Sequence, residues 1–115
     1  QFLMKKRYGK LVRDRIPAII RASGELPNSR PMEQDEYRRE LLYKLIEGAE
    51  EVRQAGYDPE SPMFVKELAD VSEVFDAILK EFEVPIETVE AAQEQRRRER
   101  GGFEDKIFLE SVQQN

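Results

Sequence analysis

The chain has 115 residues, a net charge of −5, and neither cysteine nor histidine. Without cysteine there are no disulfides, thiolate metal sites or thiol nucleophiles, and without histidine there is no Ser-His-Asp triad or histidine-bound zinc. Any bound metal must therefore be held by oxygen atoms, which favours Mg²⁺, Mn²⁺ or Ca²⁺. The acidic net charge argues against a globally basic nucleic-acid-binding protein.

The length suits a single domain, residues 1–115, in which 37% of the residues are charged, against roughly a quarter in an average globular domain. This charged fraction predicts a thin core, of the kind found in an amphipathic helical protein or in one completed by a partner subunit. No apolar run approaches the roughly 18 residues that a membrane span needs. No secretion signal is visible, so the expected compartment is the cytoplasm.

The N-terminal part of the chain divides into an extended segment, a short helix and a loop. Residues 1–9 are expected to be flexible or to derive from cloning, and the chain should stay extended up to Val12. Proline suits the first turn of a helix, which predicts a short helix from Pro17 to about Ala22 that Gly24 ends. Two prolines within residues 25–31 indicate a loop.

Three longer helices are predicted further along the chain. The first runs from about Glu33 to Ala55, is rich in Glu, Leu and Arg, contains no proline and stops at Gly56. The second spans about Pro62 to Phe82 and carries apolar residues at helical spacing. The third is opened by Pro85 and continues to about Arg100, where two glycines break it.

The C-terminal tail completes an all-α prediction. Residues 103–112 contain several large apolar side chains and are expected to pack, with a short strand against residues 11–12 as the suggested form. The predicted fold is a helical bundle of two long and one or two shorter helices with extended N- and C-terminal segments. Because a two-helix layer cannot cover both of its faces, the bundle is expected to be completed by oligomerisation to a dimer or more.

The second long helix carries carboxylates on the face that should point inward. An α-helix advances about 100° per residue, so with Glu67 at zero Asp70 falls at about 300°. The apolar stripe, marked by Val71 and Val74, falls between about 340° and 40°, so both carboxylates lie on or beside it. Glu73, at about 240°, is expected in solvent. Carboxylates that face a core are costly unless a cation or hydrogen bonds satisfy them.

The first long helix has acids at the border of its own inward face. With Leu41 at zero, Gly48 falls at about 340°, inside the inward stripe, and Glu51 at about 280°, at its edge. Glu47, at about 240°, and Glu50, at about 180°, face progressively outward. Gly48 occupies the place from which a third carboxylate would point inward. Glycine in mid-helix is also unfavourable by about 1 kcal/mol relative to alanine.

Two interpretations of these charged residues stay open. Glutamate is common on solvated helix faces, but inward carboxylates from two adjacent helices can form a cation cage, which without histidine suits a hard cation. The basic residues either complement a helix macrodipole or bind phosphate through bidentate arginine contacts. Together the acids and the basic residues suggest a Mg²⁺–polyphosphate ligand. The basic residues are Lys10, Arg13, Arg15, Arg96, Arg97, Arg98 and Arg100.

Four blocks of the sequence resemble the MazG-like all-α nucleoside triphosphate pyrophosphohydrolases, in their short, single-domain, phosphoribosyl-ATP pyrophosphohydrolase-like form. The blocks are residues 10–17 (KLVRDRIP), 44–51 (KLIEGAEE), 67–71 (ELADV) and 100–103 (RGGF). The resemblance covers nearly the whole chain, from residue 10 to about residue 109. Four blocks in the same order are specific for the family, although not for a substrate.

The resemblance implies an α-helical bundle, usually a dimer or a higher oligomer, that binds Mg²⁺, with Mn²⁺ as the other option. The family holds the metal with a Glu-Glu-x-x-Glu block and a Glu-x-x-Asp block. Carried onto this sequence, the blocks imply Glu51, Glu67 and Asp70 as metal ligands and Glu47 as the catalytic base or an outer ligand. The middle glutamate of the first block is Gly48 here, a departure that bears on metal affinity and rate.

The implied reaction is hydrolysis of a nucleoside triphosphate to a monophosphate and pyrophosphate, acting on non-standard or surplus nucleotides. Arg13, Arg96 and Arg100 are the implied phosphate contacts, and neither a membrane nor a nucleic-acid polymer is an expected partner. One alternative is a nucleotide-binding or interaction module of the same fold, in which Gly48 has weakened or removed catalysis. Another is a purely structural helical bundle.

Overall fold

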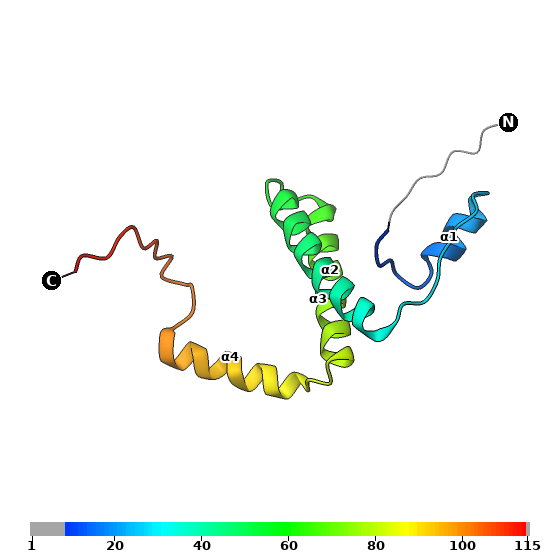
Figure 1. Ribbon diagram of the computed structural model, residues 1–115. Helices are drawn as coiled ribbons and strands as arrows, with labels where there is room; N and C mark the ends of the chain where they lie inside the picture. Colours follow the sequence, from blue (N-terminus) through cyan, green and yellow to red (C-terminus); the bar gives the residue numbers. More distant parts are fainter. Residues whose placement is uncertain (1–8, 115) are drawn as a thin grey trace. The chain divides into compact units, whose positions relative to one another are not determined.

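A computed structural model of the chain describes residues 9–114, which contain four helices and no strand (Figure 1). The helices are α1 (Ile16–Ala22), α2 (Gln34–Ala55), α3 (Pro62–Glu81) and α4 (Ile86–Arg100). The all-α prediction is confirmed, and the helices begin and end close to their predicted bounds. The expectation for the N-terminal residues falls mostly on residues 1–8, which lie outside the described range. None of the helices in this range is both long and apolar enough to cross a membrane.

Short-range signals set the helix ends. Pro17 lies in the first turn of α1, and the chain leaves that helix through Gly24, whose φ of +94° is a conformation that favours glycine. Ser61 caps α3, because its hydroxyl oxygen accepts a hydrogen bond from the Met63 amide at 3.2 Å. Pro62 follows as the first helical residue, where its missing amide hydrogen leaves no backbone bond unmade.

The chain divides into two compact units, and the first, which ends at Phe82, is built around a hairpin of α2 and α3. The two long helices lie side by side (Figure 1). Their connection, residues 56–61, is tied by hydrogen bonds from the Asp58 amide to the Ala55 carbonyl and from the Ser61 amide to the Asp58 carbonyl, at 3.1 and 3.0 Å. A connection this short returns α3 antiparallel to α2.

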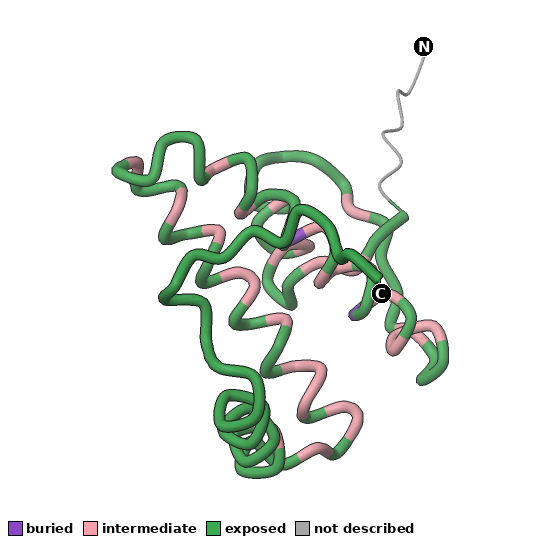
Figure 2. The backbone as a smooth tube through the Cα atoms, turned by 90° about the vertical axis from the view of Figure 1, so that its left-hand side faces the viewer, coloured by how far each residue is buried: buried purple, intermediate pink, exposed green. Residues whose placement is uncertain are grey.

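The interface between α2 and α3 is a thin core. Leu41, whose exposed fraction is 2%, and Gly48 are the buried residues of α2, and α3 contributes Val71 and Val74, which are half-buried. Figure 2 shows how little of the described backbone is buried. Both buried positions are those that the helical wheel pointed inward, and the thin core expected from the charged fraction is confirmed.

The hairpin has an acidic side and an apolar side. On α2, Leu42 and Ile46 lie about 100° and 140° around the helix from the inward stripe, in the opposite sense to Glu51. On α3, Leu68 and Phe75 turn away from that stripe in the same sense, by about 80° to 100°. All four apolar side chains are exposed, from 37% for Phe75 to 67% for Ile46. These four residues define the apolar side. The acidic side is the opposite side of the hairpin, which carries Glu47, Glu51, Glu67 and Asp70.

The second unit, from Glu83 onward, consists of α4 and the tail that follows it. Mostly polar, α4 has no buried residue and ends at Gly101, whose φ is +82°. The short strand predicted for the tail is wrong, and within this unit the large apolar side chains of the tail stay exposed. Residues 103–112 form no strand, and Phe103 and Phe108 are 96% and 85% exposed. Three consecutive charged residues after Phe103 interrupt the apolar pattern, and α4, the other element of this unit, offers no strand edge with which the tail could pair.

Candidate functional site

Helix α3 places two carboxylates on the acidic side of the hairpin. Glu67 and Asp70 lie one turn apart and are half-buried, whereas Glu73 is exposed, as the helical wheel predicted. Both half-buried acids border the inward stripe that carries Val71 and Val74. Because packing against α2 removes part of their water, each needs a cation or a hydrogen-bond donor in its place.

Helix α2 adds Glu51, whose carboxyl group lies close enough to the Glu67 carboxyl group for the two to affect each other's ionisation. Partial loss of water, the adjacent Glu67 carboxyl group and the negative charges of Glu67 and Glu47 together raise the pKa of Glu51 above its ordinary value of 4.5. The nearby Lys44 acts in the opposite direction. Much of the Glu51 side chain stays exposed, so water still screens this repulsion. A shared proton or a cation would relieve it.

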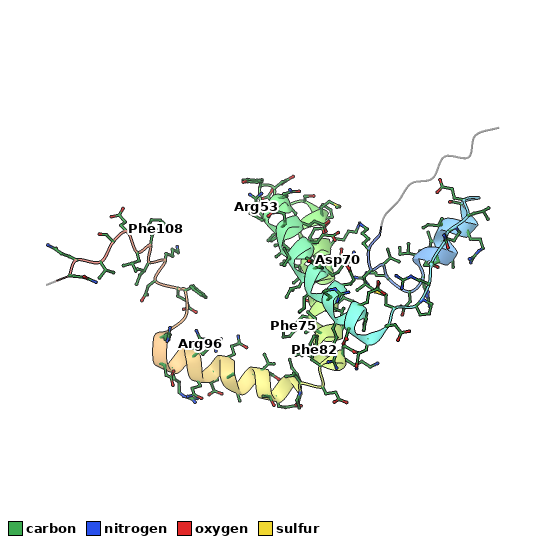
Figure 3. All side chains as sticks on the ribbon, viewed as in Figure 1. Arg53, Asp70, Phe75, Phe82, Arg96 and Phe108 are labelled. Carbon is green, nitrogen blue, oxygen red and sulfur yellow. The ribbon has the colours of Figure 1, made fainter. Side chains whose placement is uncertain are left out.

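The other two glutamates of this stretch are paired with cations. A carboxylate oxygen of Glu47 lies 3.7 Å from the Lys10 ammonium and 3.8 Å from the Lys44 ammonium. Glu50 faces outward and accepts hydrogen bonds from the Arg53 guanidinium (Figure 3 labels Arg53), which holds the pKa of Glu50 below its ordinary value. The structure therefore keeps Glu47 on the acidic side and places Glu50 in a solvent-facing ion pair.

Glu67 holds the least satisfied polar atom of the acidic side. Its Oε2 is shielded from solvent and accepts no hydrogen bond from any described residue. With Glu51 beside it, this oxygen lies among negative charges, a setting that fits a divalent cation bound by oxygen. Within residues 9–114, however, no three acidic side chains come close enough together to hold a metal as they stand. Glu51 and Glu67 are brought together, and Asp70 contacts another partner.

That partner belongs to residues 10–13, which we call the basic segment. The Arg13 guanidinium donates a hydrogen bond to the Asp70 carboxylate at 2.7 Å, and Lys10 pairs with Glu47 (Figure 3 labels Asp70). Sequence reasoning selected Arg13 for phosphate but missed this contact. Arg13 and Asp70 are 57 positions apart, and no local spacing encodes such a pair.

Gly48 lies where α2 approaches α3. A Cβ atom at this position would lie 3.1 Å from Cγ2 of Val71, which is tighter than an ordinary van der Waals contact. The glycine therefore lets the two helices approach closely, and this contact gives a physical reason for glycine in mid-helix. A glutamate at the same position would have to displace the Val71 side chain.

The other two predicted phosphate contacts, Arg96 and Arg100, belong to the second unit (Figure 3 labels Arg96). Both line an open hollow at the C-terminal end of α4, and neither forms an ion pair with a described residue, whereas Arg98 pairs with Glu94 at 2.9 Å. An unpaired cluster of this kind can bind an anion. The hollow is lined by Gln93, Arg96, Arg97, Arg100, Gly101, Gly102, Phe103 and Glu104.

Comparison with known proteins finds a partial relative. Over 46 residues, which are 40% of this chain, the sequence is 52% identical to a protein of Mycolicibacterium smegmatis that is described as uncharacterized. The match spans about half the length of that relative, 47%. No family model matches the chain, and no solved structure matches it. The resemblance to MazG-like enzymes therefore stays a prediction that rests on the sequence blocks.

Proposed function

We propose that the protein is a Mg²⁺-dependent nucleoside triphosphate pyrophosphohydrolase of the MazG-like type. It would act in the cytoplasm on non-standard or surplus nucleotides and release a monophosphate and pyrophosphate. The observation that carries the proposal is the solvent-shielded oxygen of Glu67, which accepts no hydrogen bond from any described residue and lies beside Glu51. It lies on a hairpin whose two helices carry two of the four sequence blocks.

Three carboxylates of the acidic side would hold the metal. Glu51 and Glu67 face each other across the hairpin, and Asp70 lies one turn from Glu67 on α3. All of their donor atoms are carboxylate oxygens, which suit Mg²⁺ and equally Mn²⁺. When bound, such a cation neutralises phosphate oxygens and makes a water molecule more acidic.

The remaining roles fall to Glu47 and the arginines. Glu47, half-buried on the acidic side of α2, would accept the proton of the attacking water. The oxygen of this water would form a bond to one of the two phosphorus atoms of the α–β linkage. The bond from that phosphorus to the oxygen bridging the α- and β-phosphates would break at the same time, which gives a monophosphate and pyrophosphate. Arg13, which lies in the same unit as these acids, would donate bidentate hydrogen bonds to the phosphates, and Arg96 and Arg100 stay the phosphate contacts that the resemblance implies.

We also propose that two or more copies associate through the apolar side. This side exposes four large apolar side chains. The core beside it is small, because among the described residues Leu41 is the one apolar side chain that is buried. Large apolar side chains exposed together on one side of a small protein favour an interaction surface there. A second hairpin laid on it would complete a four-helix bundle and supply the missing core.

The packing of Gly48 favours one alternative, a nucleotide-binding module with weak or lost catalysis. In this structure the position that would carry a third inward carboxylate is filled by contact with Val71. The described acids also form no ready-made cluster of three. Such a module would bind a Mg²⁺–nucleotide complex and turn it over poorly.

A pyrophosphate-release screen tests the proposal. Standard and non-standard nucleoside triphosphates are incubated with the protein and Mg²⁺ or Mn²⁺, and release is expected only with a divalent cation. Glu67→Gln should abolish release, whereas Glu73→Gln, the same change on an exposed position of α3, should leave it unchanged. Nucleotide binding without release would favour the binding module, and the absence of both would contradict both functions.

A further inference from the structure

The basic segment links the two helices of the hairpin. Arg13 contacts Asp70 of α3, with 2.7 Å between nitrogen and oxygen, and Lys10 contacts Glu47 of α2 at 3.7 Å. These two acids are a metal ligand and the base of the proposed function. The segment therefore places positive charge on one carboxylate that a divalent cation would use, Asp70, and on the carboxylate of the proposed base, Glu47.

These contacts are of a kind that can exchange. The side chains of Arg13 and Asp70 are 57% and 37% exposed, and those of Lys10 and Glu47 are 44% and 40% exposed. Water competes for exposed ion pairs, which add little to folding stability. Residues 10–13 belong to no helix or strand, so no regular backbone hydrogen bonding fixes their position on the acidic side.

We propose that Arg13 is an exchangeable counter-cation: it neutralises Asp70 while no metal is bound, yields Asp70 to a divalent cation, and then binds a phosphate group of the ligand. The inference rests on the proposed function and adds to it a residue that regulates metal binding. A guanidinium and a divalent cation compete for one carboxylate. The guanidinium, once released, stays charged and matches phosphate in a bidentate fork.

This double role gives the site a preference for the complete ligand. Free metal has to displace Arg13 from Asp70, which weakens its binding. When metal and phosphate arrive together, the displaced Arg13 gains a new partner, which strengthens their binding. If Arg13 only stabilised the fold, the result would differ. Removing its charge would then loosen the acidic side and weaken the binding both of free metal and of metal with phosphate.

The experiment compares Arg13→Gln with Arg21→Gln. Arg21 is exposed on α1 and forms no ion pair with any described residue, so its variant is the matched control. Two affinities are measured by calorimetry on the full chain. The first is for Mn²⁺ alone, and the second is for inorganic triphosphate in the presence of Mg²⁺, which avoids any choice of base or sugar.

Arg13→Gln should bind Mn²⁺ alone about two- to fivefold more tightly, the range that loss of an exposed ion pair supports. It should bind inorganic triphosphate with Mg²⁺ about tenfold more weakly, because a charged hydrogen-bond donor is lost. Arg21→Gln should match the wild type in both, and Arg13→Lys should restore the Mn²⁺ affinity toward the wild-type value.

Shifts in the same direction, or no shift, would overturn the inference while leaving the proposed function standing, provided that the wild type binds Mn²⁺. If neither the wild type nor Arg13→Gln binds Mn²⁺, the proposed function fails first and the inference fails with it. Tighter Mn²⁺ binding with unchanged triphosphate binding also contradicts the inference, since Arg13 would then have no phosphate role.

Discussion

At the scale of single residues, charge balance separates the acids of the hairpin. Asp70 and Glu47 each pair with a cation of the basic segment, whereas Glu51 and Glu67 lie beside each other and form no ion pair with a described residue. Helical periodicity was sufficient to predict that Glu67 and Asp70 border the core, because side-chain direction on a helix follows from position alone. It gave no information on Arg13, whose partner is distant in sequence.

Glu51 should give the metal-free protein a measurable pH dependence. Its folded-state pKa is raised above 4.5, so folding favours the protonated form. The stability that Glu51 contributes is complete below its unfolded pKa and is lost as pH rises through the folded pKa. Because glutamine does not ionise, Glu51→Gln removes this loss of stability at higher pH. In the presence of EDTA, the melting temperature of the variant relative to wild type should therefore increase as pH rises from below 4.5 towards neutrality.

Thermal melts at a series of pH values, with Glu73→Gln as the control, measure this difference directly. Ion pairs of Glu36 and Glu50, whose pKa values are lowered, are present in every variant and cancel in the comparison. A difference between Glu51→Gln and wild type that stays constant over the whole series would show that Glu51 titrates normally.

At the scale of helices, the ends were predictable because proline, glycine and serine act on the nearest backbone groups. The chain leaves α1 through Gly24 because glycine adopts a positive φ angle there. Helix α3 begins after Ser61 because the Ser61 hydroxyl accepts a hydrogen bond from the first turn. The strand expected within residues 103–112 failed for the converse reason. Strand formation depends on a partner elsewhere in the chain, and an apolar run carries no information about one.

The contact between α2 and α3 at Gly48 should show as energetic coupling. In wild type, Gly48→Ala gains up to about 1 kcal/mol of helix propensity but crowds Val71, and overpacking costs about 1–3 kcal/mol. In a Val71→Ala background the crowding is absent, so the same change should stabilise by up to about 1 kcal/mol. Urea unfolding of the four proteins gives the coupling, expected to be at least about 1 kcal/mol. Additive effects would place the helices further apart than described.

At the scale of the whole molecule, the high charged fraction and the thin core belong together. The first unit buries Leu41 and Gly48 between its long helices and leaves Leu42, Ile46, Leu68 and Phe75 exposed on the apolar side. The charged fraction predicted the thin core, because composition limits how much apolar surface can be buried. It did not predict which side of the hairpin stays apolar, since that depends on how the helices pair.

Self-association through the apolar side can be tested with one charge. Ile46→Glu places a carboxylate at the centre of that side and should convert the protein to a monomer, because an unpaired charge is costly inside an interface. Gln34→Glu adds the same charge at the exposed start of α2 and should leave the oligomer intact. Light scattering at micromolar concentration reports the mass. A wild-type monomer of 13.5 kDa would rule out the proposed assembly.

The most direct test of the central claim, that the acidic side holds a divalent cation, is a Mn²⁺ titration followed by electron paramagnetic resonance. Wild type should bind Mn²⁺, Glu67→Gln should bind it at least about tenfold more weakly, and Glu73→Gln should match the wild type. The tenfold figure corresponds to about 1.4 kcal/mol, the lower end of what one charged ligand supplies. Absence of Mn²⁺ binding in wild type, or equal binding by all three proteins, would contradict the claim.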